Sequence, residues 1–249
     1  MIVPYKHLIA GAALVTSVAA VQAQELPPGT EITGEVLIGT DYRFRGISQT
    51  NRSFTVQGGI EFAHESGFYA GLWGSNVDFS GGALELDPYL GFAGNITDDV
   101  EYDVGIIYYG YPKSGADPDL DFIELYASVS FMGIDFGVDY SPDYFAETGR
   151  YFYVHGAYGV ELPGEIGLDF HIGSNIFKNR SNLDEFLEID GTGVSAGSTY
   201  LDWSVTLSAE AYGLEWSLAY VDTDLKRREC FGGEKLCSST VVLSVGKSF

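Results

Sequence analysis

The chain ends in S-S-T-V-V-L-S-V-G-K-S-F over residues 238–249. Successive side chains of a strand point to opposite faces, and here one face is mainly apolar and the other mainly small and polar: Val241, Leu243, Val245 and Phe249 against Thr240, Ser244, Gly246 and Ser248. An alternating last strand that stops on an aromatic residue is typical of bacterial outer-membrane barrels, whose aromatic girdles lie at the membrane interfaces. Phe249 is also expected to form part of the signal read by the barrel assembly machinery. The segment therefore predicts an all-β, transmembrane, antiparallel up-and-down barrel.

The N-terminus has the three parts of a secretory signal peptide. A weakly basic start, Lys6-His7, precedes an apolar run over residues 8–18 and the small-residue cleavage site Val21-Gln22-Ala23. The apolar run is too short to cross a bilayer as a helix. We therefore expect residues 1–23 to be a signal peptide and residues 24–249 to form one outer-membrane barrel domain.

Period-two alternation divides the mature chain into about twelve strands of barrel length. They are predicted at 34–45, 53–63, 67–77, 83–94, 100–110, 121–131, 134–141, 151–161, 164–175, 199–210, 213–222 and 239–249. The connections alternate between tight turns and mostly longer loops, and an even strand number places both termini on the periplasmic side. A soluble barrel or sandwich would also alternate, but it would need neither the terminal aromatic nor this loop pattern.

Composition and cysteines narrow the partners. The formal net charge of −22 argues against nucleic acid or anionic lipid as a partner and favours cations. The predicted partners are small solutes and, because the chain is predicted to form a membrane barrel, outer-membrane lipid. Cys230 and Cys237 flank a short polar stretch before the last strand. In an exported protein they are expected to form a loop disulfide, with two unrelated thiols as the alternative. No paired histidine or second cysteine set nearby supports a metal site.

The alternation also predicts which side chains face the lumen. In the first predicted strand, Val36, Ile38, Thr40, Tyr42 and Phe44 are expected to face lipid. The predicted pore-lining residues, mostly acidic, are Asp41, Arg43, Arg45, Glu61, Asp87, Asp103, Glu124, Asp139, Asp169 and Asp202. Arg43 and Arg45 would form a basic rung on one face of that strand, opposite acidic walls that favour cations. Alternatively, the two arginines make cross-strand ion pairs that plug and stiffen a narrow barrel.

The sequence favours neither an enzyme nor a cofactor. A barrel phospholipase would need a serine–histidine pair on its lipid-facing outside, whereas His155 and His171 fall on predicted lumen faces, and nothing resembles a nucleophile elbow. The alternating carboxylates Asp117, Asp119 and Asp121 lack the glycine and distal glutamate of a calcium-binding loop. No catalytic residue, metal site or cofactor is therefore predicted.

Three segments resemble one known family. T-D-Y-R-F-R-G-I-S-Q over residues 40–49 is similar to the opening motif of the TorF-type family of proposed outer-membrane porins. G-F-Y-A-G-L-W-G-S-N over residues 67–76 resembles that family's next block, and G-K-S-F over residues 246–249 its ending. The resemblance covers essentially the whole mature chain and implies a porin with no assigned substrate or catalytic residue. The cysteine pair is not part of the pattern.

These observations predict a twelve-stranded barrel in the bacterial outer membrane that acts as a passive, cation-preferring pore for small solutes. The alternative is a closed barrel with a structural or surface-binding role, its lumen blocked by side chains. A barrel of this strand number lies between small filled barrels and large open porins, so the strand count does not decide between the two.

Overall fold

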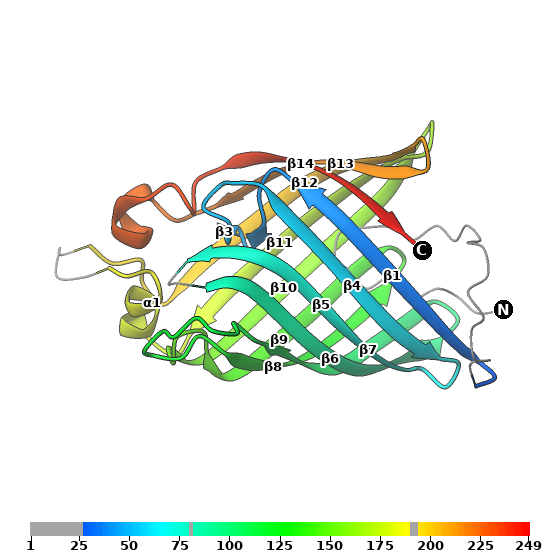
Figure 1. The fold of residues 1–249 in the computed structure, drawn as a ribbon, viewed down its shortest axis with the longest axis horizontal. Coiled ribbons are helices and arrows are strands. Elements are labelled where there is room, and N and C mark those ends of the chain that lie inside the picture. The colour runs from blue at the N-terminus through cyan, green and yellow to red at the C-terminus, as the bar shows by residue number, and fades with distance from the viewer. Residues whose placement is uncertain (1–26, 80–81, 190–193) are drawn as a thin grey trace.

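The computed structural model describes residues 27–79, 82–189 and 194–249. The predicted signal peptide, residues 1–23, lies outside the described residues. Twelve strands form one closed antiparallel barrel (Figure 1), in which β14 returns to pair with β1. The strands are β1 (Thr30–Gly39), β4 (Thr55–His64), β5 (Phe68–Phe79), β6 (Gly82–Thr97), β7 (Val100–Tyr109), β8 (Phe122–Phe131), β9 (Ile134–Tyr144), β10 (Gly149–Leu162), β11 (Ile166–Phe177), β12 (Thr199–Ala211), β13 (Leu214–Thr223) and β14 (Thr240–Ser248). The predicted fold class and strand number are confirmed.

The remaining described elements are short and lie between barrel strands. A two-stranded hairpin is formed by β2 (Arg43–Phe44) and β3 (Ile47–Ser48), which pair only with each other. The helix α1 (Arg180–Phe186) lies between β11 and β12, and two 3-10 turns, η1 (Arg227–Glu229) and η2 (Phe231–Gly233), precede β14. Among the described residues, no helix is long and apolar enough to cross a membrane.

The C-terminal strand closes the barrel down to its last residue. The register with β1 runs from Glu35 opposite Ser248 to Gly39 opposite Ser244. Beyond it, the backbone N–H of Phe249 donates to the carbonyl of Gly34 over 2.9 Å, and the N–H of Gly34 donates back over 2.8 Å. Full closure leaves no unpaired strand edge, which is a requirement for a sheet that crosses lipid.

The outer surface of the barrel is apolar. Side chains that alternate outward along the strands are largely exposed: Leu125 by 51%, Phe170 by 43% and Ile172 by 55%. The lipid-facing positions predicted on β8 and β11 are therefore on the outside, and so are Val36 and Ile38 on β1. A closed barrel with exposed aliphatic and aromatic side chains around its wall is a membrane-spanning barrel, because water would not solvate such a surface.

The two rims differ as the loop lengths predicted. Tight turns at 65–67, 98–99, 132–133, 163–165 and 212–213 form one rim, here called the turn end, near the start of β1 and the C-terminus in Figure 1. Met132-Gly133 and Tyr212-Gly213 have positive φ at both positions (51° and 79°, 59° and 70°), the geometry of type I′ hairpin turns. The connections 40–54, 110–121, 145–148 and 224–239, together with the described parts of 178–198, lie at the opposite rim with α1, here called the loop end.

The prediction of one strand over residues 34–45 is wrong at its end. The strand β1 stops at Gly39, and residues 40–54, here called the inner hairpin, turn into the barrel with β2 and β3 (Figure 1). Tyr42, expected to face lipid, is 8% exposed with its ring 5.4 Å from that of Trp73. Phe44 likewise packs inside, 5.5 Å from Tyr109. The alternation of polar and apolar residues continues over residues 40–45 and therefore predicted a longer strand. The left-handed turn at Arg45 (φ 47°) and Gly46 (φ 81°) instead folds the chain back into a hairpin.

Candidate functional site

Arg45, at the tip of the inner hairpin, forms an ion-pair cluster with the barrel wall. Its Nη1 and Nη2 donate to the two carboxylate oxygens of Glu124 on β8 over 2.7 and 2.8 Å, and Nη2 also donates to Asp139 on β9 over 3.0 Å. The side chains of Arg45 and Glu124 are only 6% and 2% exposed. Paired, parallel hydrogen bonds of this kind are the strongest that a guanidinium makes with a carboxylate.

Aromatic rings enclose the same guanidinium. Its central carbon lies 4.3 Å from the ring centroid of Tyr153, 4.6 Å from that of Phe44 and 5.1 Å from that of Tyr151. A guanidinium over an aromatic face gains a cation–π attraction that grows when water is excluded. Burial alone would lower the pKa of Arg45, but Glu124 beside it raises that pKa well above its ordinary value. The side chain is therefore a permanent cation in this position.

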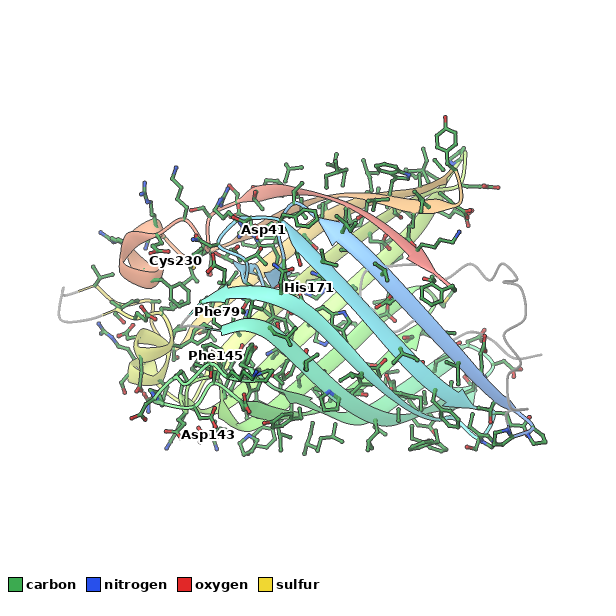
Figure 2. All side chains as sticks on the ribbon, viewed as in Figure 1. Asp41, Phe79, Asp143, Phe145, His171 and Cys230 are labelled. Carbon is green, nitrogen blue, oxygen red and sulfur yellow. A yellow bond between two sulfur atoms is a disulfide. The ribbon has the colours of Figure 1, made fainter. Side chains whose placement is uncertain are left out.

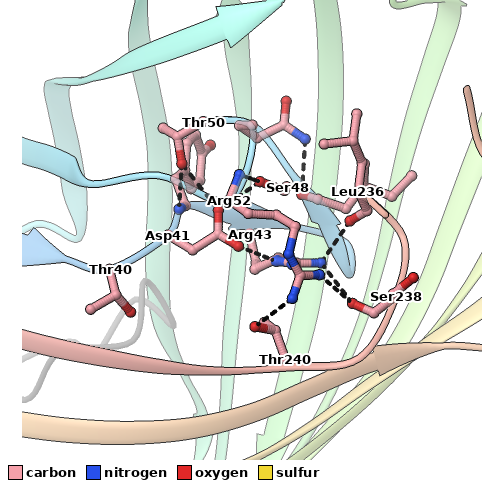
Figure 3. Close-up of polar contacts among 12 residues, drawn as sticks. Thr40, Asp41, Arg43, Ser48, Thr50, Arg52, Leu236, Ser238 and Thr240 are labelled. Carbon is pink, nitrogen blue, oxygen red and sulfur yellow. Dashed lines mark hydrogen bonds and ion pairs between the residues drawn. The ribbon is translucent and has the colours of Figure 1, made fainter. Parts of the chain in front are cut away.

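Arg43 has a different role, although it lies only two residues away. Its Nε donates to Asp41 over 2.7 Å, and its Nη1 donates to the backbone carbonyls of Leu236 over 2.7 Å and Gly46 over 3.0 Å (Figure 3). Asp41 also accepts hydrogen bonds from the hydroxyls of Ser48 and Thr50, over 2.6 and 3.0 Å. Arg43 and Asp41 thus hold the inner hairpin together and join it to the 224–239 loop. The predicted basic rung on the first strand does not form.

A second polar cluster adjoins the first on the lumen faces of β10 to β12. The hydroxyl of Tyr153 lies 2.7 Å from Nε2 of His171 and donates to Asp202 over 3.0 Å. His155 lies 3.8 Å from Asp139, the carboxylate that also accepts from Arg45. The sequence predicted that both histidines and both aspartates face inward. The alternative in which Arg45 makes an ion pair anticipated a contact with acids of the wall, but not these partners, because the inner hairpin was not expected.

Two further carboxylates lie in the same half of the barrel. Glu85 and Asp87 on β6 are 1% and 2% exposed. The hydroxyl of Tyr111 donates to Oε1 of Glu85 over 3.0 Å, whereas Oε2 of Glu85 and Oδ1 of Asp87 have no hydrogen-bond partner. Among the described residues, no three histidine, cysteine or carboxylate side chains are grouped so that they could hold a metal ion.

Aromatic residues from successive loop-end connections fill the mouth above these clusters. The rings contact one another in a continuous series, here called the aromatic cap, with centroid separations of 5.5 to 6.1 Å: Phe79–Phe145, Tyr111–Phe145, Phe145–Phe186 and Phe186–Phe231. Phe79 and Phe145 are labelled in Figure 2, beside the loop-end connections. The buried core of this molecule is thus inside the barrel at the loop end.

The turn end of the lumen is more open. Glu61, Asp103 and Asp169, predicted to line a pore, lie here on β4, β7 and β11 and are half-buried or exposed. Glu61 accepts a hydrogen bond from the hydroxyl of Tyr89 over 2.9 Å. A cavity of about 30 Å³ lies between strands β1, β4, β5, β13 and β14, lined by Glu35, Gln57, Trp73, Glu215 and Ser217 among others. The predicted site residues therefore divide into a packed set at the loop end and a hydrated set at the turn end.

The cysteines brace the loop that holds the inner hairpin. Cys230 and Cys237 form a disulfide with an S–S distance of 2.10 Å, and both are 1% exposed. The carbonyl of Leu236, next to the second cysteine, accepts from both Arg43 and the backbone N–H of Ser48. The disulfide thus constrains the part of the 224–239 loop that holds the inner hairpin in place.

A closed, lipid-facing barrel of twelve antiparallel strands defines the class of this protein as a porin-like barrel of the bacterial outer membrane. Residues 23–249 match the family described as "Bacterial protein of unknown function (Gcw_chp)", and the chain belongs to that family. A comparison with curated protein sequences found no match.

Solved porin structures share the fold. The NanC porin is similar with a TM-score of 0.55 and 11% identity, over 86% of this chain and 97% of that one. The KdgM porin in complex with disordered oligogalacturonate is similar with a TM-score of 0.54 and 7% identity, over 88% of this chain and 98% of that one. At these identities the likeness describes the architecture of the barrel.

Proposed function

We propose that this protein is a gated outer-membrane channel for small solutes, whose lumen prefers cations and whose mouth is closed by the inner hairpin. We propose further that residues 1–23 are a signal peptide and that Phe249 forms part of the signal read by the barrel assembly machinery. The resemblance to TorF-type porins is part of the same proposal. The fold shared with porins supports a channel, and the lining of the barrel supports its charge preference.

The charge of the wall is the observation that carries the proposal. Within the described barrel strands, the arginine and lysine residues are Arg150 and Lys247. Both side chains are exposed. Arg150 comes directly before Tyr151, which is fully buried in the lumen. Because successive side chains of a strand point to opposite faces, Arg150 projects outward, and Lys247 does so on β14 in the same way. The inward faces carry carboxylates on nearly every side, and rings of carboxylates favour cations over anions. In the described lumen, positive charge comes from the inner hairpin and is matched by Asp41, Glu124 and Asp139.

A second function, a closed barrel with a structural or surface-binding role, is favoured by a different observation. The inner hairpin and the aromatic cap fill the loop end, where Tyr151, Leu183 and Leu187 are completely buried. A channel needs this packing to open, whereas a structural barrel needs it to stay shut. The two functions therefore differ in whether the inner hairpin can move out of the lumen.

Planar-bilayer recording under a KCl gradient tests the proposal. The wild-type barrel and a variant in which residues 41–52 are replaced by a short Gly/Ser turn are refolded, and each is shown to be a folded barrel by circular dichroism. We expect rare, small steps from the wild type, large steps from the shortened variant, and a cation-selective reversal potential in both. A folded shortened variant that does not conduct would overturn the channel and leave the closed barrel; anion-selective steps would overturn the cation preference.

A further inference from the structure

The side chains around the Arg45 guanidinium come mostly from the barrel wall. Glu124 lies on β8, Asp139 on β9, and Tyr151 and Tyr153 on β10; these four side chains are here called the Arg45 cradle. Phe44, which also faces the guanidinium, belongs to the inner hairpin. Removal of the hairpin would therefore leave the four wall residues of the cradle in place.

An empty cradle would be strongly biased toward a cation. Glu124 is 1% exposed, and a buried carboxylate that loses its counter-charge is costly unless another cation replaces it. Asp139 accepts from the same guanidinium as Glu124, so two carboxylates of the wall share the single positive charge of Arg45. An empty cradle would therefore hold two carboxylates with no cation between them.

The shape of the cradle selects among cations. Glu124 accepts two parallel N–H donors, which a planar guanidinium or amidinium matches better than a spherical ion does. The face of Tyr153 at 4.3 Å stabilises a flat or alkylated cation through its ring. A hydrated K⁺ gains little from either feature, because it would have to give up its own water to reach them.

We propose that the Arg45 cradle is a binding site for solutes that carry a guanidinium or an amidinium group, and that Arg45 occupies it as an intramolecular substitute for such a solute. As a site for transported solutes it rests on the proposed channel function, and it names the solute class of that channel. A cationic solute that enters through the acidic turn end competes with Arg45 for Glu124 and Asp139. Its binding releases the tip of the inner hairpin from the wall.

The construction of the inner hairpin makes Arg45→Ala an informative variant. The hairpin is held to the 224–239 loop by Arg43 and Arg52, which donate to the carbonyls of Leu236 and Lys235 over 2.7 and 2.9 Å. None of these bonds involves Arg45, so the variant keeps the hairpin and empties the cradle. Arg45→Gln, which keeps more of the side-chain length without the charge, is the second variant if Arg45→Ala refolds poorly.

Binding is measured without reference to conduction. Purified full-length Arg45→Ala barrel in detergent is titrated calorimetrically with guanidinium chloride at low millimolar concentration, at constant ionic strength. Methylammonium and K⁺ are titrated in parallel. We expect saturable guanidinium binding at least about tenfold tighter than that of K⁺, and weaker binding to the wild type, in which guanidinium must first displace Arg45 from the cradle. In Arg45→Ala/Glu124→Gln the guanidinium affinity should fall about 100-fold, since the bidentate acceptor is lost.

The outcomes separate this inference from the proposed channel. Equal binding of K⁺ and guanidinium, or guanidinium binding unchanged by Glu124→Gln, would overturn the cradle as a selective site. Guanidinium binding by a barrel that never conducts would leave the cradle as a ligand site but overturn its role in transport. If Arg45→Ala conducts and guanidinium blocks it at the concentration that saturates binding, both proposals are supported. Conduction with no guanidinium binding in calorimetry would support the channel and overturn the cradle as a binding site.

Discussion

The two halves of the lumen follow the same inward alternation of side chains but use it differently. At the loop end, inward residues such as Tyr151 (0% exposed) and Glu124 (1%) are packed like the core of a soluble protein. At the turn end, Glu61, Asp103 and Asp169 retain access to solvent. Alternation therefore determines the side of the wall on which a residue lies. What the residue does there depends on whether the hairpin and loops cover it.

The halves should therefore differ in what their charges contribute. A carboxylate buried at the loop end needs its partner, because the low dielectric penalises an isolated charge. A carboxylate in the hydrated half is screened, so its removal changes the field in the lumen more than the stability of the barrel. We therefore expect stability to reside at the loop end and the proposed charge preference at the turn end, a division that substitutions can test.

The largest expected effect is that of Glu124→Gln. The change leaves the buried Arg45 without its bidentate partner and should lower the free energy of unfolding by about 3–5 kcal/mol, the usual cost of breaking a buried ion pair. Reversible urea unfolding in lipid vesicles, followed by tryptophan fluorescence, measures it. Glu61→Gln at the turn end is the matched control, and equal losses in the two variants would contradict the division into halves. Arg45→Met added to Glu124→Gln should recover part of the loss, since the buried cation that has lost its bidentate partner is then removed.

A smaller effect is expected from Leu183→Ala in α1. Leu183 is fully buried and belongs to the apolar cluster beneath the loops, so its truncation opens a cavity that costs about 2–5 kcal/mol in a well-packed core. Met132→Ala, at a turn-end position that is 76% exposed, should change stability by less than about 0.5 kcal/mol. The same urea titration measures both. If Leu183→Ala is as mild as Met132→Ala, the loop end is not a core.

The alternation and the loop lengths were enough to predict the barrel. Twelve strands, their order and the outward faces of β8 and β11 follow from period-two patterns that a membrane wall imposes on each strand. The inner hairpin was missed because residues 40–45 continue the same alternation past Gly39. Two local signals were available. Gly46 tolerates the left-handed φ of 81° that the turn requires. Three of the five residues 41–45 are charged, which is more charge than a strand of a membrane wall usually carries.

The contacts of the site could not be predicted in the same way. Glu124 and Asp139 were predicted to face the lumen, but their pairing with Arg45 joins residues 79 and 94 positions apart. Such a contact depends on how far a loop folds into the barrel, which no period in the sequence encodes. The aromatic cap raises the same difficulty: Tyr111, Phe145 and Phe231 lie in separate connections, and their proximity is a property of the closed barrel.

A small effect on stability, and the sharpest test of the turn end, is expected from neutralising two of its carboxylates. Glu61→Gln with Asp103→Asn should lower the free energy of unfolding by less than about 1 kcal/mol, because both groups lie in the hydrated half. In the channel shortened over residues 41–52, the same pair should move the reversal potential under a KCl gradient toward zero, since the lumen loses two negative charges. Glu165→Gln with Asp99→Asn removes the same charge from exposed turns outside the lumen and should leave the potential where it was. A shift of equal size in this control would mean that the net charge of the protein, rather than the lining of its turn end, sets the preference for cations.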